Sequence, residues 1–116
     1  MLADPEHLKK VAEIARSVGI HHVEVGTERP DRDVIIGDPP AGAITYRRHG
    51  SPALRCESLL SASDVEAALH ELAHVVNGYD GDENEERCYQ TAAIWALRFP
   101  PAVSARVNEM AREAFL

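Results

Sequence analysis

The chain has 116 residues, of which 45% are apolar, and its formal net charge at pH 7 is −7. A chain of this length forms one domain, and its apolar fraction is typical of a folded globular protein rather than a disordered one. The excess negative charge disfavours binding to nucleic-acid phosphates and to anionic membrane surfaces. We therefore expect a single domain over residues 1–116 that has neither nucleic acid nor a membrane as its partner.

The expected compartment follows from the terminus and from the cysteines. The N-terminal residues are acidic and lack the basic and apolar regions of a signal peptide, and no apolar run reaches the roughly 18 residues of a membrane span. Cys56 and Cys88 are far apart and do not have the spacing of metal ligands. These features predict a cytoplasmic protein with two reduced, buried thiols, and one disulfide is the alternative.

The first half of the chain predicts one helix followed by short strands. Asp4 is a candidate N-cap, Pro5 suits the first helical position, and Gly19 follows the last apolar residue at helical spacing. Strand patterns follow at residues 20–25, 34–36, 44–49 and 53–59. The last two flank Gly50-Ser51-Pro52, which predicts a hairpin turn.

The second half predicts three helices. Ser63 and Glu66 have the spacing of a capping box, and the helix that they begin ends at Asn77-Gly78.

Asp82 and Glu85 suggest a second capping box, for a helix that runs to Phe99, and Pro101 can begin a last helix after the break at Pro100. This order predicts an α+β domain in which one helix precedes a short, mainly antiparallel sheet of three to four strands and three helices follow it.

The motif with chemical content is His70-Glu71-Leu72-Ala73-His74, an HExxH sequence. Residues four apart lie one above the other on a helix, so His70 and His74 can bind the same zinc ion. Glu71 is rotated by about 100° from His70, which prevents chelation but allows it to reach a zinc-bound water. Zinc lowers the pKa of that water to about 7, so Glu71 is the candidate general base.

A catalytic zinc site usually has three protein ligands and one open position. No histidine follows His74, so the candidates for the third ligand are acidic residues in the next turn and helix. They are Asp80, Asp82, Glu83, Glu85 and Glu86.

With these residues the chain resembles the gluzincin zinc metallopeptidases, and in size it is similar to minigluzincins and to the ImmA/IrrE-type peptidase domain. The resemblance implies a zincin-like fold and a ligand glutamate on the second helix, with a residue four positions later that supports a ligand histidine. Glu86 followed by Gln90 fits this arrangement, and Glu85 followed by Tyr89 is the alternative. We prefer Glu86, because Glu85 lies nearer a stripe that runs from Cys88 to Phe99 and predicts core packing.

The same resemblance implies a zinc-dependent hydrolase that acts on a peptide or protein substrate. It implies that the strand at 53–59 forms one wall of the cleft and pairs with an extended substrate. Tyr46, Tyr79 and Tyr89 are candidates for the side chain that stabilises the oxyanion. Three alternatives remain: a hydrolase of another bond, a catalytically quiet, metal-stabilised interaction or regulatory module, and a metal-free binding domain in which the histidines are incidental.

Overall fold

The computed structural model describes residues 2–26, 35–36, 43–48, 51–78 and 81–115. In chain order the elements are α1 (Pro5–Ser17), β1 (His22–Val25), β2 (Ile35–Ile36), β3 (Ala43–Arg48), β4 (Ser51–Cys56), α2 (Ala62–Asn77), α3 (Asp82–Trp95), the 3₁₀ helix η1 (Ala96–Arg98) and α4 (Pro101–Phe115). The predicted α+β class is confirmed. None of the helices in these ranges has the length and apolarity needed to cross a bilayer.

The sheet has the strand order β1-β4-β3-β2. β2 and β4 each pair antiparallel with β3, whereas β1 pairs parallel with β4, with His22 opposite Ala53 and Val25 opposite Cys56. β4 inserts between β1 and β3, so the first and last strands in chain order lie side by side. The sequence pattern did not predict this crossover.

β4 therefore lies in the interior of the sheet. Its residues pair with β1 on one side and with β3 on the other, and Leu59 beyond its end forms a bridge with Ala3. The expectation that residues 53–59 pair with an extended substrate is wrong, because the backbone hydrogen-bonding edges of this segment are already used. The predicted strand end is also wrong, since β4 ends at Cys56.

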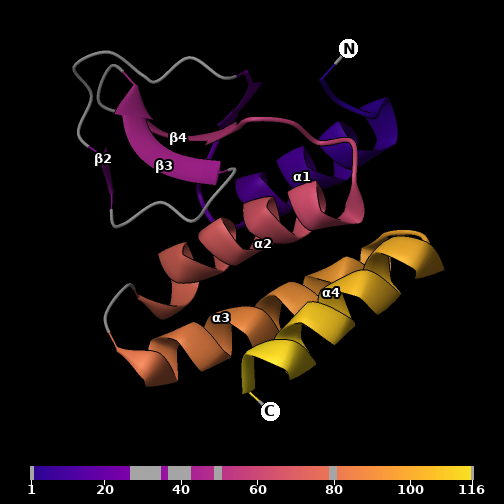
Figure 1. Cartoon of the computed structure of the whole chain (residues 1–116). Helices are drawn as coiled ribbons and strands as arrows, with labels where there is room; N and C mark the ends of the chain where they lie inside the picture. Colours follow the sequence, from indigo (N-terminus) through magenta and orange to yellow (C-terminus); the bar gives the residue numbers. More distant parts are fainter. Residues whose placement is uncertain (1, 27–34, 37–42, 49–50, 79–80, 116) are drawn as a thin grey trace.

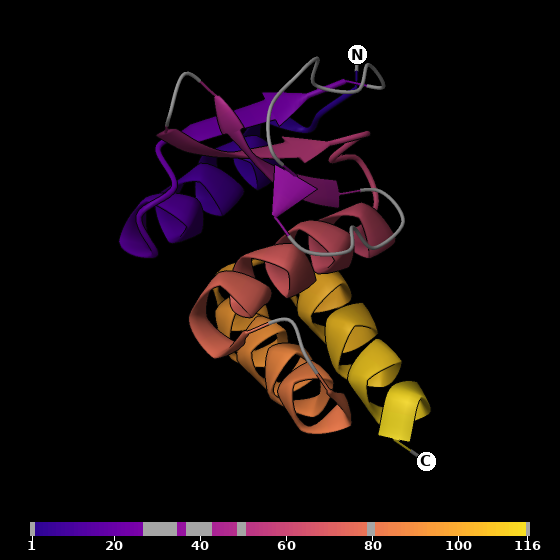
Figure 2. The same ribbon diagram turned by 90° about the vertical axis from the view of Figure 1, so that its left-hand side faces the viewer.

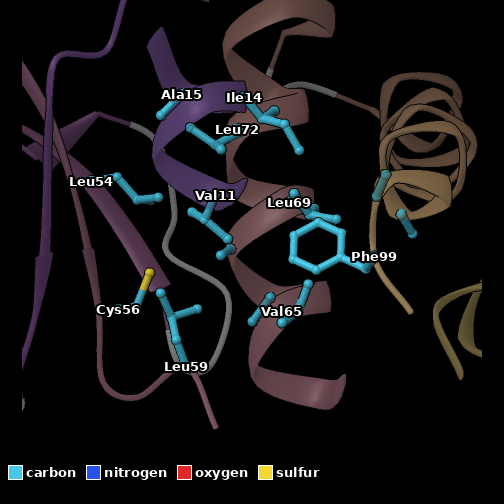
Figure 3. Packing of buried hydrophobic residues seen from close by; sticks show 14 of the residues in the cluster. Val11, Ile14, Ala15, Leu54, Cys56, Leu59, Val65, Leu69, Leu72 and Phe99 are labelled. Atoms are coloured by element: carbon cyan, nitrogen blue, oxygen red, sulfur yellow. The ribbon is translucent and has the colours of Figure 1, made fainter. Parts of the chain in front are cut away.

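α2 runs through the middle of the molecule, with the sheet and α1 on one side and α3 and α4 on the other (Figures 1 and 2). Its position buries every residue from Val65 to His74. A single hydrophobic cluster joins the two sides, and Figure 3 shows Val65, Leu69 and Leu72 of α2 packed among side chains of the neighbouring elements. These neighbours include Val11 and Ile14 of α1, Leu54 and Cys56 of β4, and Phe99. Because α2 packs against other elements on two sides, the directions in which its side chains point are fixed.

The start of α2 differs from the prediction. Ser61 is the N-cap and forms a capping box with Asp64, so the helix begins before Ser63. The Asp64 carboxylate accepts three hydrogen bonds, from the Ser58 hydroxyl at 2.7 Å, from the Leu60 amide at 2.9 Å and, within the capping box, from the Ser61 amide at 3.0 Å. An acceptor that gathers three donors outcompetes the Ser63–Glu66 pair, which leaves Glu66 inside the helix rather than at its cap.

Other helix ends agree more closely with the sequence. Asp4 caps α1 with Pro5 in its first turn, Gly78 ends α2, and Pro101 begins α4. α3 ends at Trp95 and continues as η1, so the helix predicted to reach Phe99 is shorter than expected. Both cysteines are buried and free, as predicted.

Candidate metal centre

His70 and His74 lie one turn apart on α2, and the fold buries both. The two residues are 4% and 6% exposed, and their ring centroids are 4.9 Å apart with an interplanar angle of 79°. The HExxH spacing thus has the predicted effect of bringing two imidazoles together on one face. Because α2 is packed between two layers, this face points at a neighbouring element rather than into open solvent.

That neighbouring element is α3, which brings Glu85 to the histidines. The Glu85 carboxylate places Oε1 2.7 Å from Nε2 of His70 and Oε2 3.2 Å from Nε2 of His74. One ligand atom from each of the three residues can be chosen so that all three lie within 4.8 Å of one another. The side chain of Glu85 remains 44% exposed, so solvent reaches the cluster from this side.

The structure corrects the preference for Glu86, which is exposed. Adjacent helical residues point about 100° apart, so only one of the two glutamates can face α2. α3 packs on α2 through Cys88 and Ala92, which are both buried, and Glu85 precedes Cys88 by three positions on the same face. The stripe that runs from Cys88 to Phe99 was correctly predicted to pack in the core. The preference for Glu86 that was drawn from it was wrong, because the same helix face continues past Cys88 to Glu85, which lies beside the histidines.

Glu85 also does not cap α3. The N-cap is Gly81, and no side chain makes a cap hydrogen bond there. The capping box predicted from Asp82 and Glu85 is therefore wrong. Its carboxylate instead faces α2, where Oε1 lies 2.7 Å from Nε2 of His70, so the carboxylate is not available to cap α3.

His74 is oriented by the end of its own helix. Its Nδ1 lies 2.7 Å from the backbone oxygen of Gly78, which can only accept, so this nitrogen carries the proton. In the neutral imidazole, Nε2 then carries the lone pair, and it is Nε2 that faces Glu85. Gly78 adopts φ +95°, a conformation that favours glycine, and its amide donates to the backbone oxygen of His74 at 2.8 Å.

The Cys88 thiol lies 3.3 Å from the same Nδ1 atom of His74. Burial raises the pKa of Cys88 to about 11, and the charge of Glu85 raises it further. In the metal-free chain Cys88 is therefore a thiol at neutral pH. Its position beside Nδ1, rather than beside Nε2, indicates a packing role behind the ligand.

His70 differs from His74 in the surroundings of Nδ1, the ring nitrogen that does not face Glu85. Burial lowers the pKa of His70 and outweighs the opposing effect of Glu85, which favours the neutral form that binds metals. Its Nδ1 is buried and makes no hydrogen bond within the described part of the chain, and Oε1 of Glu66 lies 3.7 Å away. Burial raises the pKa of Glu66 to about 7, the charge of Glu85 also raises it, and Arg106 of α4 lowers it.

Tyr89 lies against His70, with ring centroids 4.4 Å apart. It follows Glu85 by four positions and therefore occupies the supporting position of the alternative ligand set, whereas Gln90 is exposed. Of the other candidates for oxyanion stabilisation, Tyr79 and the side chain of Tyr46 lie outside the described residues. Tyr89 is thus the only one of the three that can be placed.

Glu71 is fully buried, with an exposed fraction of 0%. Its charge acts on two thiols, Cys56 of β4 and Cys88 of α3. Burial, with smaller contributions from Asp64 and then Glu71, raises the pKa of Cys56 to about 12. The candidate base therefore lies in a poorly solvated environment.

The donor set fits a zinc ion. Two imidazole nitrogens and one carboxylate are a known three-ligand set for catalytic zinc, with bonds of about 2.0–2.2 Å and a fourth position left open. Such bonds at tetrahedral angles put the ligand atoms about 3.3 Å apart. The separations of 2.7 and 3.2 Å between the histidine nitrogens and the Glu85 oxygens are already close to this value.

This geometry predicts that Glu85→Ala weakens zinc binding by more than about 100-fold, because changes to residues behind the ligands alone cost 10- to 100-fold. Glu86→Ala has the same change in charge and volume one residue along the helix and is expected to bind zinc like the wild type. Competition titration against a chromophoric chelator measures both. Equal losses in the two variants would contradict the assignment of Glu85.

Two supporting groups were missed by the sequence reasoning. Glu66 was assigned to a helix cap, although its i, i+4 spacing to His70 and on to His74 places it on the same helix face. Gly78 was read only as a helix stop, and the use of its carbonyl has no sequence signal.

Comparisons of the chain with protein-family models, with curated proteins and with solved structures return no match.

Proposed function

We propose that the chain is a zinc-dependent hydrolase with a zincin-like arrangement of the gluzincin type, acting on peptide bonds. The observation that carries the proposal is the convergence of His70, His74 and Glu85, whose ligand atoms lie within 4.8 Å of one another. The glutamate required for water activation, Glu71, follows the first of these histidines directly. This combination distinguishes a hydrolytic site from a structural one, since structural zinc sites usually have four protein ligands.

The proposal gives each residue of the site a specific role. His70, His74 and Glu85 would hold the zinc, and solvent would reach it from the side of the half-exposed Glu85 side chain. Bound zinc supplies a Lewis acid that polarises a carbonyl and lowers the pKa of water to about 7. Glu71 accepts a proton from the attacking water and then delivers it to the leaving amine. Tyr89, beside His70, is the candidate donor to the developing oxyanion.

A second candidate function, a catalytically quiet module stabilised by zinc, is favoured by the burial of Glu71. A general base has to reach the proton that it accepts, yet this side chain is 0% exposed and the two histidines are at most 6% exposed. In such a module the metal would tie α2 to α3 and stabilise a surface for a partner. The hydrolase requires in addition that Glu71 reaches the open position when substrate is bound.

Peptide cleavage separates the two functions. The zinc-loaded chain is incubated with a diverse mixture of unstructured peptides, and new termini are identified by mass spectrometry. The hydrolase predicts termini that disappear after chelation and return when zinc is restored. A zinc-bound chain that yields no cleavage, although zinc raises its melting temperature, would favour the quiet module.

A further inference from the structure

We propose that Glu66 is a positioning residue for the metal centre: its carboxylate accepts a hydrogen bond from the Nδ1–H group of His70 and thereby orients Nε2 of this ring toward the ion. The inference rests on the proposed metal site, which it deepens. No part of the zinc-ligand motif indicates it, because Glu66 lies one turn before the first histidine.

The argument begins with the protons of a neutral imidazole, which carries a single N–H. Without metal, Nε2 of His70 lies 2.7 Å from Glu85 and can donate to that carboxylate. When Nε2 binds a cation its lone pair is engaged, so the proton has to reside on Nδ1. Zinc binding thus creates a new buried donor at an atom that has no hydrogen-bond partner in the described residues.

Glu66 is the group placed to accept that donor. Its Oε1 lies 3.7 Å from Nδ1, too far for a hydrogen bond, but a movement of about 0.5–1 Å brings the pair into range. Both side chains are rigidly enclosed, with exposed fractions of 5% for His70 and 9% for Glu66. A buried donor without a partner costs about 1–3 kcal/mol, so closing this gap favours the metal-bound state.

The two histidines are therefore supported by different means. The Nδ1 of His74 donates to the backbone oxygen of Gly78 at 2.7 Å, and this bond depends only on the end of α2. The Nδ1 of His70 depends on a side chain and can be tested by substitution. Ligand histidines commonly donate their outer N–H to a carboxylate or a backbone carbonyl, and here the site contains one of each.

A purely structural role for Glu66 is the competing explanation. Arg106 of α4 acts electrostatically on Glu66, as do Glu85 and Tyr89 of α3, so the carboxylate could serve only to hold α4 near α2. The two roles differ in what happens without metal. If Glu66 were structural, replacing it would destabilise the metal-free chain. A positioning residue makes its hydrogen bond only in the metal-bound chain, and burying its charge costs free energy, so replacing it leaves the metal-free chain at least as stable.

The experiment compares Glu66→Leu, Glu66→Gln and the wild type, with Glu86→Gln as the control for loss of one negative charge on the exposed surface of α3. Zinc affinity is measured by chelator competition, and the melting temperature of the metal-free chain is measured separately. We expect Glu66→Leu to bind zinc 10- to 100-fold more weakly while its metal-free melting temperature stays at or above that of the wild type. Glu66→Gln keeps an oxygen that accepts from Nδ1 and is expected to lose less affinity than the leucine variant.

Nuclear magnetic resonance provides a second measurement that a structural role would not affect. In the zinc-loaded wild type, the Nδ1 proton of His70 is expected to appear as a downfield, slowly exchanging resonance, and this resonance is expected to move upfield in Glu66→Leu. Wild-type affinity in Glu66→Leu, or equal loss in Glu86→Gln, would overturn the inference while leaving the metal site intact. Absence of zinc binding by the wild type would instead overturn the proposed function itself.

Discussion

The His74→Ala chain is expected to retain no zinc after exhaustive dialysis, whereas the wild type retains about one ion per chain. Three candidate ligands converge in the structure, and removing one leaves His70 and Glu85, which we expect to hold the ion too weakly for it to survive dialysis. Elemental analysis of both proteins, with concentrations from amino-acid analysis, measures the stoichiometry directly.

Thermal unfolding tests the same site by an independent quantity. A ligand that binds only the folded chain stabilises it by about 4 kcal/mol at a free concentration of 1,000 times its Kd. For a domain of 116 residues, this shifts the melting temperature by on the order of 10 °C. We expect zinc to produce this shift in the wild type and none in His74→Ala.

His21→Ala is the matched control, because His21 is exposed and precedes β1, away from α2. It removes one histidine without removing a ligand and is expected to bind one zinc. A wild-type chain that takes up no zinc even when the metal is added back would contradict the metal site and the enzyme together. The remaining explanation would then be a metal-free binding domain in which the two histidines pair with Glu85.

The Glu71→Gln chain is expected to retain its zinc and to lose peptide cleavage. Glutamine has almost the same shape as glutamate, so the fully buried side chain can keep its packing. The amide cannot accept a proton from water at neutral pH, and loss of a general base costs about 10²- to 10⁴-fold in rate. The ratio kcat/KM on a cleaved peptide, measured beside the zinc content of each preparation, gives the result.

Retention of zinc is the internal control in this comparison, because it separates loss of a proton acceptor from loss of the ion. His70→Ala is expected to lose both zinc and cleavage. Undiminished cleavage by a zinc-loaded Glu71→Gln chain would show that another group takes the proton. If wild type and variant are both inactive and equally stabilised by zinc, the quiet module becomes the function of this site.

Local spacing in the sequence determined the parts of the site that belong to one helix. The i, i+4 relation of His70 and His74 places both rings on one face whatever the helix packs against. The start of α1 at Asp4 and Pro5, and the end of α2 at Gly78, were predicted for the same reason, because backbone preferences there act over a few residues.

Tertiary structure decided every feature that depends on how two elements pack. Glu85 and Glu86 have the same chemistry, and only the packing of Cys88 and Ala92 against α2 selects which of them meets the histidines. The insertion of β4 between β1 and β3 depends on pairing with distant residues, which the alternation within one strand does not specify.

The role inferred for Glu66 likewise depends partly on sequence spacing and partly on tertiary packing. Its place on the histidine face of α2 is a matter of spacing, but its burial and its distance from Nδ1 of His70 arise from α3 and α4 closing over that face. The sequence by itself thus determined which residues of α2 can bind a metal ion. The packing of α3 and α4 determined which glutamate of α3 meets the histidines and where the Glu66 carboxylate lies, because helix orientation depends on contacts between segments far apart in the chain.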